Sequence, residues 1–197
     1  MTEDRLAKQI EFIVQIDKLK DIMRQNVVTG SRRRESDAEH SWHLAMMAVL
    51  LAEYAAEPGI DVSRVVKMAL VHDLVEIDAG DTFCYDEQGN LDKEEREKQA
   101  AARLFALLPA DQAAALMALW QEFEAMATAE ARFANCLDRL QPLLLNYHSD
   151  GHTWKKPGVN RAKVLKRNQV SQENAPRLWR LACELIDDSV KQGLLKP

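Results

Sequence analysis

Apolar residues recur at spacings of three and four through most of this 197-residue chain, and this periodicity constrains its fold most strongly. Such spacing is typical of helices that bury one face, and few runs show the period of two that strands require. The sequence therefore predicts an all-α fold. Helices are expected over residues 5–22, 36–56, 62–79, 92–107, 110–126, 129–148, 160–168 and 172–192.

Several of these helices follow residues that can cap an N-terminus. The segment "SDAE" matches a capping box, in which the side chains of Ser36 and Glu39 each bond to the other's backbone N–H. A polar stretch, "RQNVVTGSRRRE", separates this helix from the first one. Further suitable caps are Asp61 or Ser63, Thr128, and Ser171.

Composition predicts one globular domain that spans residues 1–197. Hydrophobic residues make up 47% of the chain and charged residues 29%, a balance typical of soluble proteins. No apolar run of about 18 residues could cross a membrane, and the charged N-terminus does not look like a signal peptide. The net charge of −5 argues against a general nucleic-acid binder. Three widely spaced cysteines cannot form a complete disulfide set, so we expect a cytoplasmic location.

The stretch "LVHDLVEIDAGD" at 70–81 sets ionisable residues among apolar ones. On a helical wheel, His72, Asp73 and Glu76 share the arc of the apolar residues in the preceding turns. The opposite side is also apolar, so this part of the helix is expected to be buried. Burial of charged groups without partners is costly, so these side chains need partners elsewhere in the chain.

Two other helices also direct an ionisable side chain toward the core. His40 lies in the middle of the apolar face of the capped helix, and Asp138 shares an arc with apolar residues of the 129–148 helix. Two His and two Asp that converge have the composition of a divalent metal site. The alternative is a buried ion network with Arg139 or Arg132 as counter-ion. Spacing alone is compatible with both.

The order of these residues resembles the HD-domain metal-dependent phosphohydrolases. Their pattern is a single His, later an adjacent His-Asp pair and finally an Asp, which here would be His40, His72 with Asp73, and Asp138. The resemblance runs from about residue 15 to 150. It implies an HD-type helical bundle in which these four side chains are the metal ligands.

The subgroup that contains the bacterial 5′-deoxynucleotidases is the most similar. Its members carry "AEHS" or a similar segment around the first His, and "HDLxE" with a downstream "GD". This chain reads "ESDAEHSW" at 35–42, "HDLVE" at 72–76 and "GD" at 80–81. An isolated "HD" pair carries no information, but the whole pattern in this order is specific.

The number of metal ions follows from the histidine positions. HD proteins with two metals supply extra His between the His-Asp pair and the final Asp, and this chain has none between Asp73 and Asp138. The resemblance therefore implies one ion and hydrolysis. Two imidazoles and two carboxylates suit Mn, Fe, Co, Ni or Zn. Four ligands around an octahedral ion leave about two positions for water and a phosphate oxygen.

The resemblance also assigns roles to two acids. Glu76 and Asp81 follow Asp73 by three and eight positions, as do the acids that the deoxynucleotidases use near the metal. Glu76 would orient or deprotonate the attacking water, or stabilise the protonated phosphate. Asp81 would protonate the leaving 5′-oxygen or bind the sugar. The structural alternatives are a salt bridge for Glu76 and a turn acid for Asp81.

Phosphate binding requires fixed cations, and in the family an Arg upstream of the first His contacts the phosphate. Arg24 and Arg33 are the candidates, although either could be an ordinary surface charge. This segment departs from the deoxynucleotidase pattern, in which an Arg-Trp pair is expected. The basic run at 155–167 could border the substrate entrance, with Trp154 available to stack on a base, or it could be a solvated face. His43 is expected in the core or behind the ligands.

Together these residues lead to one leading function and two alternatives. The resemblance implies a metal-dependent phosphohydrolase that removes phosphate from a (deoxy)nucleoside 5′-monophosphate. A phosphodiesterase or pyrophosphohydrolase could use the same scaffold. A non-catalytic metal-binding helical protein is disfavoured by Glu76 and Asp81, which a structural ion does not require. A homodimer is implied by the resemblance, and the apolar helix at 110–126 would permit one.

Overall fold

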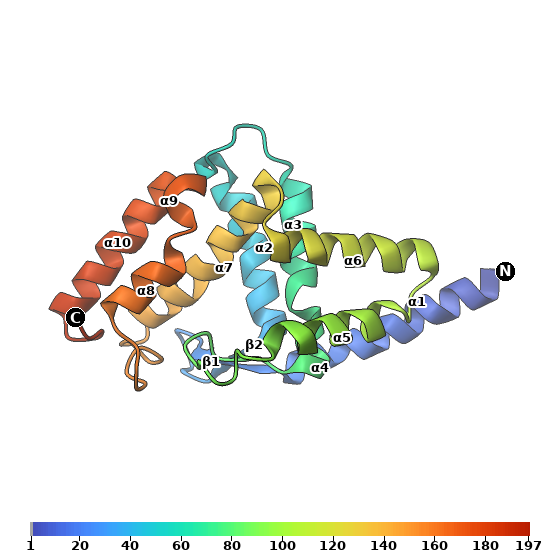
Figure 1. Ribbon diagram of the computed structural model, residues 1–197, viewed down its shortest axis with the longest axis horizontal. Coiled ribbons are helices and arrows are strands. Elements are labelled where there is room, and N and C mark those ends of the chain that lie inside the picture. Colours follow the sequence, from blue (N-terminus) through green and yellow to red (C-terminus); the bar gives the residue numbers. More distant parts are fainter. Residues whose placement is uncertain (1) are drawn as a thin grey trace.

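The chain folds as a helical bundle, as the periodicity predicts (Figure 1). The computed structural model describes residues 2–197, with side chains from residue 4 onward. Among these residues, no helix combines the length and apolar content needed to cross a bilayer. The α-helices are α1 (Thr2–Ile16), α2 (Asp37–Leu51), α3 (Val62–Val71), α4 (Glu76–Ala79), α5 (Lys93–Phe105), α6 (Ala110–Ala125), α7 (Ala129–Tyr147), α8 (Arg161–Asn168), α9 (Ser171–Asn174) and α10 (Pro176–Lys191).

The helix α7 lies between α2 and α3 on one side and the C-terminal helices α8 to α10 on the other (Figure 1). Leu44 of α2, Met68 of α3 and Leu137 of α7 are fully buried where these three helices pack together. Since α7 is covered on both sides, most of its residues are out of water. The residues that form the candidate site project from this central packing.

Two further apolar clusters flank the central one. The first joins α5 and α6 to the N-terminal helix through Phe12, Phe105 and Trp120. The second packs α8 and α10 against the end of α7 and includes Trp154 and Ile186. The site is therefore held between three packed groups of helices.

The N-terminal caps confirm the sequence signals. Ser36 and Glu39 form the complete capping box at the start of α2. Asp61 accepts a hydrogen bond from the backbone N–H of Arg64, and Thr128 caps α7 through Ala131. These caps satisfy backbone donors that a helix leaves open at its first turn. They fix where α2, α3 and α7 begin, and thus the register of the site residues on them.

The polar stretch before α2 contains a small antiparallel sheet that the sequence did not predict. Its strands are β1 (Met23–Val27) and β2 (Arg34–Ser36). A turn joins them, closed by the backbone bond from Val28 N to Arg33 O at 2.9 Å. The adjacent Val27 and Val28 before Gly30 were the available sign of a strand and turn.

Three predicted helices are interrupted. The 5–22 helix ends at Ile16 and continues as a 3₁₀ turn, η1 (Asp17–Asp21). The capped helix ends with another 3₁₀ turn, η2 (Ala52–Tyr54). The 62–79 helix changes to a third, η3 (His72–Val75), before α4. Wheel angles calculated at 100° per residue therefore hold only as far as Val71, although Leu74 and Val75 are buried as expected.

The C-terminal helix is also divided, because the prediction of a helix over 172–192 overlooked Pro176. Ala175 leaves the helical region between α9 and α10, with φ −156° and ψ 69°. A residue before proline is disfavoured in the helical region, so the break falls there. The predicted cap at Ser171 is wrong, because this residue is the first of α9 and no side chain caps that short helix; α10 begins with the proline itself.

The central packing should dominate the stability of the fold. We expect Met68→Ala to lower the free energy of unfolding of the metal-free protein by about 2–5 kcal/mol, because it removes a fully buried side chain. Leu70→Ala on the same helix is the matched control. Leu70 is 48% exposed, so its loss should be below about 1 kcal/mol. Urea unfolding measures both values, and equal losses would contradict this view of the core.

Candidate metal centre

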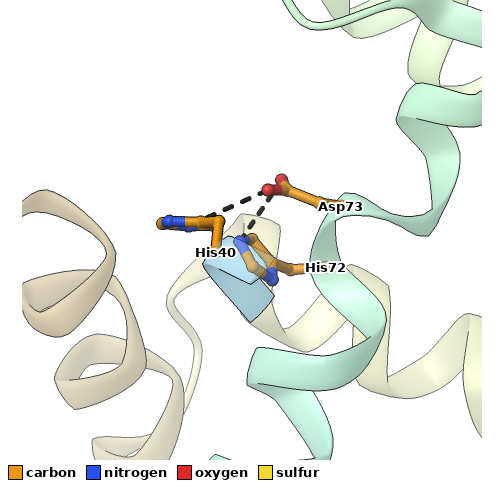
Figure 2. A group of neighbouring side chains, drawn as sticks. All are labelled: His40, His72 and Asp73. Carbon is orange, nitrogen blue, oxygen red and sulfur yellow. Dashed lines mark ion pairs between the residues drawn. The ribbon is translucent and has the colours of Figure 1, made fainter. Parts of the chain in front are cut away.

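Three of the four predicted ligands, His40, His72 and Asp73, have ligand atoms within 4.8 Å of one another, and Asp138 adjoins the two histidines. His40 lies on α2, His72 and Asp73 on η3, and Asp138 on α7. The Nε2 atom of His40 is 3.1 Å from Asp138 Oδ1 and 3.8 Å from Asp73 Oδ2. The Nε2 atom of His72 is 3.2 Å from Asp73 Oδ1 and 3.8 Å from Asp138 Oδ1. Figure 2 shows His40 and His72 directed toward Asp73.

The outer nitrogen of His72 is held by the backbone. Its Nδ1 atom lies 2.9 Å from the carbonyl oxygen of Ala69, which can only accept, so Nδ1 carries a proton. The buried Nε2 atom has no hydrogen-bond partner among the described residues. Against the effect of burial, the charges of Asp73 and Asp138 raise the pKa of His72 to about 9, so without a metal ion the ring also holds a proton on Nε2 at neutral pH. A divalent ion would replace that proton and meet an Nε2 lone pair directed at the two carboxylates, as in a metal-ligating His.

A polar chain fixes His40 in the same tautomer. Its Nδ1 lies 3.0 Å from Oε1 of Gln141, while Nε2 of that amide donates to Glu35 Oε1 at 2.6 Å. The amide nitrogen also lies 3.2 Å from Nδ1 of His43. Because these contacts direct both hydrogens of the Gln141 amide elsewhere, its oxygen accepts a hydrogen bond from the Nδ1–H of His40. The lone pair on Nε2 of His40 then faces Asp138. His43 thus stands behind the ligands, as the sequence predicts.

Negative charge exceeds positive charge around this point. Besides Asp73 and Asp138, the buried carboxyls of Glu35, Asp37 and Glu76 lie close by. Burial raises the pKa of Glu35 to about 7, and burial with the charge of Asp73 raises that of Asp37 to about 8. Without a further cation, these groups hold protons that they would otherwise release.

Arg24 is the main protein cation among these acids. Its Nη1 atom donates to Asp73 Oδ2 at 2.7 Å and to Asp37 Oδ1 at 3.0 Å. It enters from β1, so the unpredicted sheet is what brings it to the site. The next residue, Gln25, lines the same cavity. The counter-ion of Asp73 is therefore Arg24. Of the two arginines that the sequence suggested, Arg132 bonds to Asn174 elsewhere, and Arg139 donates to Asn135 with its Nη1 atom 4.0 Å from Asp138 Oδ2.

Glu76 and Asp81 line a cavity of about 100 Å³ next to the four candidate ligands. Burial and the charge of Asp73 raise the pKa of Glu76 to about 9, against the effect of Lys93, whose Nζ lies 3.8 Å away. Burial also raises the pKa of Asp81. The carboxyl of Glu76 is therefore protonated at neutral pH, and that of Asp81 holds its proton more firmly than an exposed aspartate does.

Two predicted substrate contacts are not brought to the cavity. Arg33 lies on the surface, where its Nη1 donates to Glu39 Oε2 at 2.8 Å, because the turn after β1 directs it toward the start of α2. Trp154 is buried in the C-terminal apolar cluster and cannot stack on a base. Of the basic run, Arg167 does line the cavity.

The donor set fits a divalent cation. The Nε2 atoms of His40 and His72, one of them without a hydrogen-bond partner among the described residues, each lie 3.1–3.8 Å from an oxygen of Asp73 and of Asp138. Lone pairs and anionic oxygens repel each other at such distances unless a proton or cation lies between them. His40, His72, Asp73 and Asp138 therefore stay the candidate ligands, with Gln141 and Ala69 as the groups that orient the imidazoles.

Metal binding should stabilise the fold through these side chains. We expect Mn²⁺ or Co²⁺ at about 100 times its Kd to raise the Tm of the metal-stripped protein by roughly 5–10 °C, because only the folded chain assembles the ligands. Asp138→Asn should abolish most of this increase. Asp150→Asn, at an exposed carboxylate paired with Arg32, is the matched control and should keep it. A full increase in Asp138→Asn would remove Asp138 from the ligand set.

Comparison with known proteins gives three informative similarities. The chain is 57% identical to a predicted metal-dependent phosphohydrolase from Magnetospirillum magnetotacticum MS-1, whose crystal structure matches with a TM-score of 0.92 over 100% of this chain and 98% of that one. It is 30% identical to 5′-deoxynucleotidase HDDC2 of Homo sapiens, over 89% of this chain and 83% of that protein. The namesake from Dictyostelium discoideum is 33% identical over 72% and 77%. A family model described as HD domain matches residues 16–179, and the chain belongs to the HD domain family.

Proposed function

We propose that this chain is a metal-dependent phosphohydrolase that removes phosphate from a deoxynucleoside 5′-monophosphate. The observation that supports this most is that two of the four candidate metal ligands, Asp73 and Asp138, line one cavity together with two further acids, the buried Glu76 and the half-buried Asp81. Its similarity to 5′-deoxynucleotidases over most of their length supports the substrate class. A purely structural ion would need neither acid.

One divalent ion would be held by His40, His72, Asp73 and Asp138, and the mixed nitrogen and oxygen donors suit Mn, Fe, Co, Ni or Zn. Such an ion polarises a P–O bond and lowers the pKa of a bound water. The absence of further His between Asp73 and Asp138 supports a single ion. Arg24, fixed by two carboxylates beside the centre, would bind the phosphate and orient it.

Glu76 is placed to handle the proton of the attacking water or of the phosphate. Its Oε2 atom is buried and has no hydrogen-bond partner among the described residues, so it can bond to a substrate atom or a water. A pKa near 9 keeps the carboxyl protonated when the chain is free of metal. A nearby divalent charge favours the ionised form, which can accept a proton.

Asp81 would protonate the leaving 5′-oxygen or bind the sugar. It stands at the start of the loop 81–92 and shares the cavity wall with Thr82, Phe83 and Asn90. Its pKa is raised by burial, which favours a carboxyl that can donate a proton. The polar and aromatic side chains beside it would face the nucleoside part of the substrate.

A nucleotide panel tests this function. Phosphate release by the metal-restored protein should occur with deoxynucleoside 5′-monophosphates and be lost in Asp138→Ala. Glu76→Gln should lower kcat by roughly 10²–10⁴, because general acid–base catalysis contributes that range. Colorimetric phosphate detection measures both. Cleavage of diesters or pyrophosphates with the monophosphates untouched would support the alternative activity, and metal binding without any turnover would reject the hydrolase.

We also propose that two copies of the chain associate through α1 and α2. Among residues 4–197, most large exposed apolar side chains lie on these two helices rather than on α6, the surface that the sequence suggested. Both stripes have the same spacing, and α1 projects beyond the rest of the bundle (Figure 1). The stripes are Leu6, Ile10, Ile13 and Val14 on α1, and Trp42, Met46, Val49 and Leu50 on α2.

A two-fold dimer would use each stripe twice, which suits a self-complementary contact. We expect sedimentation equilibrium to give the mass of a dimer for the natural chain, and that of a monomer for Ile10→Asp and Trp42→Asp. Leu91→Asp is the control, because this side chain is 78% exposed in the loop after α4 and lies outside both stripes. A monomeric natural chain would refute the association.

A further inference from the structure

Three basic side chains line the cavity at the candidate metal centre: Arg24, Lys93 and Arg167. The first two are ion-paired with carboxylates of the protein. Arg167 differs, since its guanidinium makes no hydrogen bond within residues 4–197. Its nearest carboxylate oxygen is Oδ2 of Asp138, at 4.0 Å from Nη2, which is beyond hydrogen-bond distance. A cation beside a candidate ligand therefore keeps its donors available.

The helix α8 supplies this cation from the basic run at 155–167. Other members of the run have partners on the surface: Arg161 pairs with Asp187, and Lys163 with Glu87. Arg167 instead points into the cavity, with its side chain 32% exposed. The sequence allowed this run to border the substrate entrance or to form a solvated face. Each description fits only part of it, because Arg167 lines the cavity and the other basic residues of the run do not.

A groove of about 430 Å³ continues from the cavity past Arg167. Its wall carries further cations, Arg139, Lys163 and Lys166, with Glu87 as the acid among them. The positive charge of this groove adjoins the acidic centre on the side of Asp138. Arg167 lines both the cavity and the groove, so it is the cation of this surface that an anion bound at the centre could contact.

On the basis of the function proposed above, we propose that Arg167 is a substrate-binding residue, which donates to an oxygen of the phosphate and then to the inorganic phosphate product. Arg24 shares its donors with two carboxylates, so it cannot supply all the hydrogen bonds that a phosphate accepts. The planar fork of a guanidinium matches two phosphate oxygens at once. Arg167 supplies these donors from the opposite end of the chain.

Titration calorimetry of inorganic phosphate into the metal-loaded full chain tests this role without turnover. Arg167→Gln should weaken phosphate binding by roughly 10- to 100-fold, as expected for the loss of a charge-assisted hydrogen bond. Arg167→Lys should lose less, because it keeps the charge without the fork. Lys166→Gln is the matched control, since it removes one charge from the exposed neighbour on α8 that lines only the groove. It should change the Kd less than about threefold.

Several outcomes would overturn the proposal. These are an unchanged Kd in Arg167→Gln, an equal loss in Lys166→Gln, which would indicate a general field, and no phosphate binding by the natural chain. An unchanged metal-induced shift in Tm for Arg167→Gln verifies that the fold and centre are intact. Phosphate binding that depends on Arg167, without hydrolysis of any monophosphate, would reject the proposed function and leave this role standing.

Discussion

The gathering of buried carboxylates around Arg24 is the interaction on which the site depends. The guanidinium of Arg24 donates hydrogen bonds to Asp73 and Asp37 at 2.7 and 3.0 Å. No arginine or lysine among the described residues donates a hydrogen bond to Asp138, Glu35 or Glu76. Charge of one sign removed from water is costly, and the raised pKa values of several of these acids express that cost. The packing of α2, α3 and α7 holds them together nevertheless. A centre of this kind is prepared for a cation that the chain itself does not provide.

The candidate ligands could be singled out in the sequence because each interrupts the apolar pattern of a predicted helix. His40, His72 and Asp138 are conspicuous where apolar residues are expected, and their order resembles a known family. The groups that orient them gave no such signal. Gln141 is neutral and fully buried, and Asp37 looks like an ordinary acid in the first turn of a helix. The role of Gln141 depends on contacts with His40 and Glu35 across about a hundred residues, and that of Asp37 on Arg24 of a strand that the sequence did not predict. Periodicity encodes neither contact.

The fold was predicted as far as local signals decide it. Helix starts followed from caps such as Ser36 and Thr128, since a cap acts on its own turn. The sheet of β1 and β2 was missed because a short pairing gains its stability from the helices around it. The apolar stripe of α1 was expected to face the core, yet Leu6, Ile10 and Ile13 are more than half exposed. A pattern shows that a face is apolar, not what covers it.

The position of Arg24 on a strand paired with that of Glu35 has a thermodynamic consequence. Arg24 neutralises Asp73, and Glu35 acts through Gln141 on the orientation of His40, so one hairpin contacts the partners of two candidate ligands. An anion that drew Arg24 from Asp73 would return negative charge to the centre and strengthen its hold on a cation. Linkage would make this reciprocal, since the cation would raise the affinity for the anion by the same factor. We therefore expect the hairpin to couple the binding of the two ions.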